Sequence, residues 1–363
     1  MGDWSERPAT ADDVIAALRL IMGREPADAD EIPAHLSNGT VGQLRDAFLR
    51  SVEFSLVMRG LLGESQPAVE PLRPYAAALH LLRPGTAPGV EWRFEEPSLT
   101  DPVSQLCTAA QVREDRYFDL CARTGMHPSA HRKPWELCYI PAVLARAGLL
   151  SPGRRVLGFG CGEEPLPSFF AREGLSVLAT DAPPEVIADQ GWDNTGQHAA
   201  GPDAMFFGHI VPRDVFDRQV AFRAVDMNAI PADLRGFDAC WSACALEHLG
   251  SIEHGLRFLE NSLATLRPGG IAVHTTEFNL ASDEATIEHS TLCLFRRQDI
   301  ERLLARLVAA GHRPWALNLH PGAGEMDAHI DRPPYGLPHL KLDLGGFVTT
   351  SIGIVVERGP VAA

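Results

Sequence analysis

The chain has 363 residues, 45% hydrophobic and 22% charged, which is typical of a globular protein and enough chain for two domains. Its formal net charge of −15 argues against a nucleic acid partner, because phosphate contacts need a basic face. No apolar stretch reaches the ~20 residues of a membrane helix, and the N-terminus lacks the pattern of a signal peptide. The seven cysteines have no Cys-x-x-Cys spacing and suit a reducing compartment, so a cytoplasmic location is expected.

The first predicted unit is helical and covers residues 11–64. Asp12 and Asp13 can cap one helix, because their carboxylates can accept from backbone N–H groups of the first turn. Thr40 can cap a second helix over 41–50.

Two runs of this unit, one from Ile21 and one from Phe48 into an apolar stretch that begins at Ser51, resemble a small helical domain of bacterial proteins linked to surface sugars. The resemblance implies a sugar-linked role. A dimerisation or packing module fits the same residues, and a homo-oligomer stays an open alternative.

We expect three parts in the chain: a helical domain at 1–66, a linker with covering helices at 67–149, and the main domain at 150–363. Prolines and glycines concentrate at the start of the second part, and helical periodicity returns after it. Trp135 and Glu136 lie on a predicted covering helix. They could reach a site in the main domain, although packing is the simpler role for Trp135.

The main domain starts with a short apolar strand and a glycine-rich turn over 155–162. Gly158, Gly160 and Gly162 let the backbone turn tightly and approach a ligand, since no Cβ stands in the way. A helix is predicted next, over 165–173.

A second predicted strand, 175–181, ends at Asp181. This carboxylate follows the turn by about 20 residues, the separation at which an acid can accept hydrogen bonds from a ribose diol. A third strand over 222–228 contains Asp226 and Met227. Together these elements predict a crevice that binds a nucleoside.

The fourth predicted strand ends at Ser242, and Glu247 and His248 follow it. The remaining predicted elements are a helix over 255–266, a strand over 271–275, a helix over 296–311, and strands over 315–319 and 347–356. An insert at 320–345, rich in His, Asp and Pro, is too long for a hairpin loop and is expected to shape a substrate pocket.

These pieces, in this order, resemble the class I S-adenosylmethionine-dependent methyltransferases over roughly residues 150–357. The resemblance implies an α/β fold with a Rossmann-like sheet of seven strands, mostly parallel with the last strand antiparallel, preceded by an all-α domain. It also implies S-adenosyl-L-methionine as the cofactor.

In such a sheet, ligands bind beyond the carboxyl ends of the strands. The predicted cofactor-binding residues are therefore those at the strand ends: Gly158, Gly160, Gly162, Asp181, Asp226, Met227 and Ser242. Asp181 is expected to hold the ribose hydroxyls, while Asp226 and Met227 flank the adenine. Either acid could instead be a strand-end residue that pairs within the protein, with Arg223 or Asn228 as the partner of Asp226.

The chain departs from the family pattern in two places. The last glycine of the turn is often followed by small residues in the family, whereas Glu163 and Glu164 stand here. The family usually has an acid at the end of the first strand, where this chain has Gly158. The amino group of a bound methionine part therefore needs another partner. Glu163 and Glu164 are candidates, together with groups from the N-terminal segment.

His248 is the predicted general base, because a neutral imidazole can remove the proton of an alcohol near pH 7, and Glu247 is its predicted orienting partner. Capping of a helix start is the alternative role for the pair. A divalent cation is the rival mechanism: some related enzymes have a glutamate three residues before the Glu-His pair, where Cys244 stands here. The side chains that could supply ligands from later loops are His274, Glu277, His320, Asp331 and His339, and no spacing among them assigns a metal.

The sequence thus predicts an S-adenosylmethionine-dependent O-methyltransferase that acts on a sugar or glycan hydroxyl, with a place in polysaccharide biosynthesis. An N- or O-methyltransferase of a small non-sugar metabolite is one alternative. An enzyme that uses NAD or a nucleotide sugar is another, although Glu163 stands where the third glycine of a dinucleotide turn would be. A non-catalytic cofactor-binding scaffold is the third.

Overall fold

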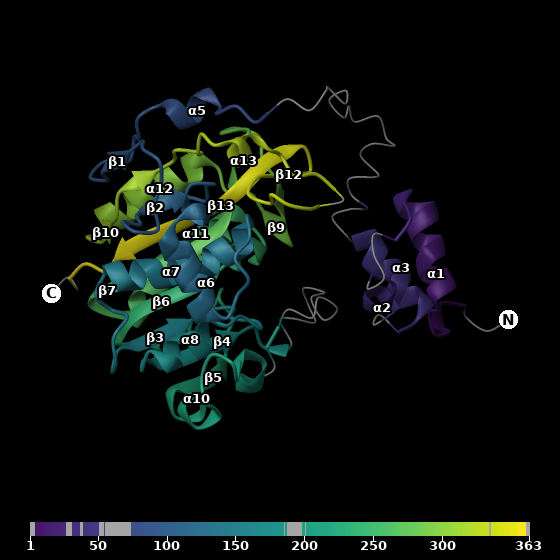
Figure 1. Cartoon of the computed structure of the whole chain (residues 1–363), viewed down its shortest axis with the longest axis horizontal. Helices are drawn as coiled ribbons and strands as arrows, with labels where there is room; N and C mark the ends of the chain where they lie inside the picture. The colour runs from purple at the N-terminus through teal and green to yellow at the C-terminus, as the bar shows by residue number, and fades with distance from the viewer. Residues whose placement is uncertain are drawn as a thin grey trace. The chain divides into compact units, whose positions relative to one another are not determined.

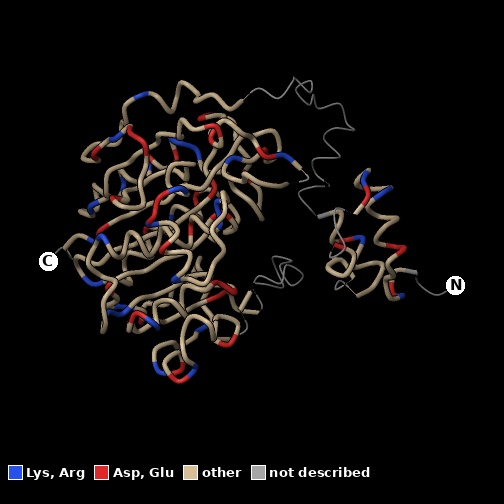
Figure 2. Tube along the Cα trace, in the orientation of Figure 1, with Lys and Arg blue, Asp and Glu red and all other residues tan. Residues whose placement is uncertain are grey.

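The computed structural model describes residues 4–26, 31–36, 39–50, 54, 74–184, 186, 198–199, 201–333 and 335–360. They fall into two compact units, one within the first 73 residues and one from Pro74 onward (Figure 1). Lys and Arg are interspersed with Asp and Glu along both units (Figure 2). None of the described helices has the length and the apolar character needed to cross a membrane.

The first unit is helical, as predicted. It contains η1 (Trp4–Glu6), α1 (Ala11–Ala17), a π-helical turn η2 (Leu18–Met22), α2 (Glu31–Leu36) and α3 (Val41–Arg50). Thr10, rather than Asp12 or Asp13, is the N-cap of α1, and the Asp13 carboxylate completes a capping box by accepting from the Thr10 backbone N–H. Thr40 does accept from the backbone N–H of Gln43 at the start of α3 (3.3 Å).

A small apolar core holds this unit together, formed by Val14, Leu18, Met22, Leu44 and Phe48. The helix α2 has no counterpart in the sequence analysis, because Pro33 falls inside it and only six residues form it. Most of the apolar stretch that begins at Ser51 lies outside the described residues.

The second unit is built on one sheet, whose strands lie in the order β1-β11-β2-β13-β7-β6-β3-β4-β5. The strands are β1 (Trp92–Arg93), β2 (Ser104–Leu106), β3 (Arg155–Gly158), β4 (Ser176–Asp181), β5 (Val220–Ala224), β6 (Phe237–Ala243), β7 (Leu266–Asn279), β11 (Leu317–Asn318) and β13 (Phe347–Glu357). β10 (Arg313–Pro314) and β12 (Leu342–Leu344) also pair with β13. The neighbouring strands β7, β6, β3, β4 and β5 are all parallel to one another, and β13 is antiparallel to β7. Both findings agree with what the resemblance implied.

Helices cover both faces of this sheet, as a parallel sheet requires (Figure 1). Along β3, Val156 joins the core under α6 (Asp115–Thr124), α7 (Arg132–Arg146) and α8 (Leu166–Arg172), whereas Leu157 joins the core under α11 (Ile252–Ser262) and α12 (Arg297–Ala309). Trp241 and Cys240 of β6 divide between the two cores in the same way, because side chains of a strand alternate between its faces.

The remaining described elements are short: α5 (Leu79–Leu82), η3 (Gln111–Arg113), η4 (Pro202–Met205), α10 (Arg213–Gln219), η5 (Leu246–His248), η6 (Leu263–Thr265), α13 (Glu325–Ala328) and a hairpin of β8 (Glu288–His289) with β9 (Leu292–Cys293). The insert at 320–345 thus contains α13 and β12.

The segment predicted as a linker with covering helices also contributes strands. β2 lies between β13 and β11, and β1 extends the sheet beyond β11. Strand β2 was not predicted, because its residues Ser104 and Gln105 are polar yet fully buried. The main unit therefore begins at Pro74, well before residue 150.

Candidate active site

The glycine-rich turn follows β3 and is held by its neighbours on both sides. The Phe159 N–H donates to the Trp241 carbonyl of β6 (2.8 Å), and the Cys161 N–H donates to the Thr180 carbonyl of β4 (3.0 Å). Gly160 and Gly162 have φ angles of 57° and 52°, in the left-handed region that favours glycine. The predicted strand, tight turn and following helix α8 are therefore all present.

Asp181 ends β4 and lies beside this turn, as its spacing predicted. Its carboxylate accepts from the backbone N–H of Gly162 (3.1 Å), Ala182 (2.8 Å) and Ala199 (2.7 Å), and contacts Nδ1 of His198 (3.2 Å). A carboxylate has about four lone-pair sites, so these contacts occupy the hydrogen-bond acceptor sites of Asp181. A ribose diol that binds Asp181 must therefore take the place of donors from residues 198–199.

Asp226 and Met227 follow β5, in a loop rather than inside a strand. The Asp226 carboxylate accepts from the Asn228 N–H (2.8 Å), whereas Arg223 pairs with Asp233. A Cβ on Gly160 would lie 3.3 Å from the Met227 sulfur, so Met227 borders the glycine turn.

Ser242 lies near the end of β6, but its side chain points into the core. It is fully buried, and its hydroxyl contacts Nδ1 of His274 (2.8 Å), whose Nε2 contacts the Ser262 hydroxyl (3.1 Å). Burial lowers the pKa of His274 to about 3, so this histidine is neutral in the core. Ser242 faces α11, and we leave its side chain out of the proposed cofactor site; His274 likewise cannot reach a metal in the crevice.

A buried group of carboxylates lies around the carboxyl ends of β6 and β7 and the neighbouring amino-terminal half of β13. Glu136 of α7, Glu247 of η5 and Glu277 of β7 are at most 4% exposed. Cys244, which has an uncommon positive φ of 48°, donates from its thiol to Glu136 (2.9 Å). Burial raises the pKa of the Cys244 thiol, so the sulfur keeps its proton. We call Glu136, Cys244, Glu247 and Glu277 the acidic cluster.

Hydroxyl groups and two cations surround the acidic cluster. Thr276 donates to Glu247 (3.0 Å), and Ser351 donates to Glu136. Arg132 pairs with Glu277, and Lys133 lies 3.4 Å from Glu136. Three carboxylates thus face two cations, which leaves one negative charge in excess.

Helix α7 explains why the cluster contains Glu136. The residue before Glu136 on this helix is Trp135, whose ring stacks on that of Tyr139 with the centroids 4.9 Å apart. The Trp135 indole N–H donates to the Gln111 side chain (2.8 Å), so Trp135 has the packing role expected for it. The next residue along α7 then points toward the sheet ends, where it meets Cys244 and Ser351. Glu136 therefore does reach the site from outside the predicted main domain.

His248 is half-buried at the end of η5. Its Nδ1 contacts the Thr291 carbonyl of the β8–β9 hairpin at 2.6 Å, a contact that places the ring proton on Nδ1 and makes Nε2 the basic nitrogen. The Thr291 carbonyl is thus one group that holds this imidazole, and Glu247 accepts from Thr276.

The predicted metal ligands are divided by the fold. Asp331 pairs with His339, whose ring lies 4.3 Å from that of His131, and His320 packs on Phe94. Among the described residues, the group whose ligand atoms lie within 4.8 Å of one another is Cys244, Glu247 and Glu277. Of the predicted set only Glu277 belongs to it, and Arg132 already pairs with that carboxylate.

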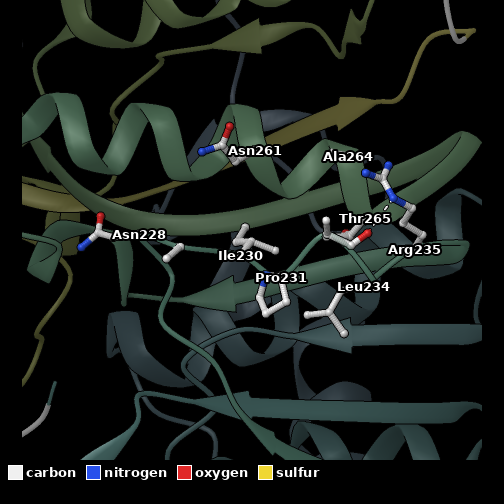
Figure 3. Close-up of a pocket in the computed structure, with 10 residues that line it drawn as sticks. Asn228, Ile230, Pro231, Leu234, Arg235, Asn261, Ala264 and Thr265 are labelled. Carbon is white, nitrogen blue, oxygen red and sulfur yellow. Dashed lines mark hydrogen bonds between the residues drawn. The ribbon is translucent and has the colours of Figure 1, made fainter. Parts of the chain in front are cut away.

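A surface pocket of about 310 Å³ lies apart from these residues, between the loop after β5 and α11. Figure 3 shows Asn228 at one end and Arg235 at the other, with Asn261 of α11 above them. The residues that line it include none of the predicted site, so chemistry rather than cavity size identifies the active site here.

A family model described as a methyltransferase domain matches residues 130–314, slightly more than half of the chain. The chain belongs to this methyltransferase family. The match begins just before α7 and ends at β10, so it contains the glycine turn, Asp181 and the acidic cluster. The protein is an S-adenosylmethionine-dependent methyltransferase.

Several solved structures are similar to this chain at low sequence identity. A sarcosine dimethylglycine methyltransferase from Galdieria sulphuraria is 12% identical, with a TM-score of 0.39 over 68% of this chain and 99% of that one. The magnesium protoporphyrin IX methyltransferase of Synechocystis is 13% identical, with a TM-score of 0.36 over 68% and 95%. An amino pentose methyltransferase from Micromonospora echinaspora is 16% identical, with a TM-score of 0.34 over 66% and 96%. The curated proteins contain no match to this chain.

The residues of the crevice fit S-adenosylmethionine. The turn offers backbone without side chains at Gly160 and Gly162, and a Cβ on Gly160 would lie only 2.9 Å from that of Ala245. Asp181 offers a carboxylate to a diol. The turn and the acid would together hold the sugar and the methionine part, so these residues fit the cofactor.

Proposed function

We propose that this methyltransferase methylates a hydroxyl oxygen of a sugar or glycan. The observation that carries the proposal is the acidic cluster: Glu136, Glu247 and Glu277 are buried carboxylates at the acceptor end of the crevice. Carboxylates that already accept from Thr276 and Ser351 can accept equally from acceptor hydroxyl groups, which a sugar supplies in number.

The cofactor, when bound, supplies a methyl group on a positively charged sulfur, so the protein must align an acceptor and remove one proton. We assign the proton to His248. Its Nδ1 contact with the Thr291 carbonyl makes Nε2 basic, and a neutral imidazole suits removal of an alcohol proton near pH 7. Glu247 lies one residue earlier and would hold a neighbouring hydroxyl of the acceptor rather than orient His248.

We assign the cofactor contacts to Gly158, Gly160, Gly162, Asp181, Asp226 and Met227. The resemblance of the N-terminal unit to sugar-linked helical domains supports the same acceptor class. A small non-sugar metabolite remains the second candidate, because the excess negative charge of the acidic cluster also suits an amine.

Radiolabelled S-adenosylmethionine and a panel of acceptors test the proposal. The panel holds free sugars, nucleotide-linked sugars and glycans, with amino acids, amines and phenols as the comparison. Transfer of label to a sugar oxygen, located by mass spectrometry, is the expected result. Transfer only to a nitrogen or to a phenol would overturn the acceptor assignment while leaving the enzyme class intact.

The variant His248→Gln tests the base. We expect turnover to fall about 100-fold or more, the usual range for loss of a general base, with unchanged S-adenosylhomocysteine binding. His254→Gln is the matched control, because His254 is an exposed histidine whose Nδ1 also contacts a carbonyl, that of Leu249 (3.0 Å). Equal turnover in both variants would remove His248 from the mechanism.

A further inference from the structure

The position after Leu157, where the family usually carries an acid, has no room for one. An added Cβ on Gly158 would lie well inside 3.0 Å of both the Trp241 ring and the Cys161 sulfur. The Trp241 indole, fully buried on the neighbouring strand β6, therefore occupies the space into which a side chain at position 158 would extend. An acidic side chain at position 158 would therefore clash with the Trp241 ring.

The same tryptophan positions a different carboxylate. Its Nε1–H donates to Oε1 of Glu164 at 2.7 Å. The backbone N–H of Glu164 donates to the Cys161 carbonyl (3.1 Å) and so closes the glycine turn. Glu164 is only 9% exposed. Glu163, one residue earlier, is exposed. The two candidates that the sequence could not separate thus differ in burial and in orientation.

We propose that Glu164 binds the ammonium group of the cofactor's methionine part, in the role that a strand-end acid would have had at position 158. The bound cofactor carries this ammonium next to the glycine turn, and a desolvated ammonium needs an anionic partner. Glu164 is a buried carboxylate on that turn, held by a donor from β6 so that its second oxygen can face a ligand. This inference concerns the cofactor and does not depend on the acceptor.

The charge state of Glu164 supports the assignment. Burial raises its pKa to about 7, opposed by the Trp241 hydrogen bond and by Lys133. The charged and titratable groups that face it are Lys133 of α7, Asp181 of β4 and Cys161 of the turn itself. The raised pKa means that part of the population of this carboxyl carries a proton near neutral pH. An arriving ammonium favours the carboxylate, so binding should release a proton to solvent.

Titration calorimetry with two ligands tests the proposal. S-adenosylhomocysteine has the ammonium, whereas 5′-methylthioadenosine has the same nucleoside without the amino-acid part. For Glu164→Gln we expect S-adenosylhomocysteine to bind about 10-fold more weakly or worse, with 5′-methylthioadenosine unchanged. Glu163→Gln, which removes the same charge at an exposed position, should alter neither affinity.

The parent protein gives a second readout that needs no variant. The observed binding enthalpy at pH 7, compared between phosphate and Tris buffers, reports the number of protons released. We expect a net release of protons with S-adenosylhomocysteine and none with 5′-methylthioadenosine. Equal loss of both ligands in Glu164→Gln, equal effects of the two variants, or no proton release by the parent would each overturn the proposal. Loss of sugar methylation with normal cofactor binding would instead count against the proposed acceptor.

Discussion

A buried carboxyl with a raised pKa makes a definite prediction for stability. The pKa of Glu164 rises from 4.5 to about 7 in the folded protein because burial disfavours the carboxylate. Between these two values the folded state therefore binds more protons than the unfolded state. The free energy of unfolding must then fall as the pH rises through this window, and the full loss is reached above pH 7.

The size of the effect follows from the same two values. One pKa unit corresponds to about 1.36 kcal/mol, so the contribution of Glu164 to the free energy of unfolding falls by about 2–3 kcal/mol between pH 5 and pH 8. Glu164→Gln removes the titration and keeps a side-chain oxygen for the Trp241 N–H. The difference in unfolding free energy, variant minus parent, should grow by about that amount over this range.

Urea denaturation followed by tryptophan fluorescence at pH 5, 6, 7 and 8 measures the difference. Glu163→Gln serves as the control and should track the parent at every pH, because an exposed glutamate loses nothing on folding. A constant difference between Glu164→Gln and the parent from pH 5 to pH 8 would refute the argument, since it would place the carboxyl in water-like surroundings.

Three further predictions follow from the core and the site. His274→Gln should make the protein less sensitive to acid. Burial lowers the pKa of His274 from 6.5 to about 3, so the free energy of unfolding of the parent falls by about 2 kcal/mol through this group between pH 7 and pH 5. The urea midpoints of the parent and the variant should therefore diverge over that range. Asp181→Asn should weaken S-adenosylhomocysteine binding about 10- to 100-fold by calorimetry, and full affinity would exclude a ribose contact. Gly158→Ala should lower the free energy of unfolding by about 1–3 kcal/mol, because the added methyl group overpacks against Trp241. The double variant with Trp241→Ala should lose less stability than the sum of the two single variants. Strict additivity would show that the two side chains do not meet.

Much of the main unit could be predicted from local patterns. The strand, glycine turn and helix from Arg155 to Arg172, and the acid at the end of β4, follow from hydrophobic runs, glycines and spacing, which act within a few residues of one another. Their placement in one crevice follows from the rule that parallel strands end on the same edge. The sequence by itself therefore determined the fold class, the cofactor and the positions of Gly160, Gly162 and Asp181.

Tertiary packing decided which neighbours of those positions face the crevice. Ser242 ends a strand just as Asp181 does, but the alternation of side chains turns it toward α11 and His274. Glu163 and Glu164 are chemically identical, and their burial and the Trp241 contact of Glu164 distinguish them. The sequence could not report this, because burial is a property of the assembled layers.

The acidic cluster shows the same limit over longer separations. Glu136 meets Cys244 and Ser351, residues that lie 108 and 215 positions away along the chain. Strand β2 was hidden for a related reason, since Ser104 and Gln105 are polar and become buried only by pairing with β11 and β13. Local patterns specify backbone conformation, whereas contacts between distant segments depend on how the helices and the sheet pack, and these contacts give the site its chemistry.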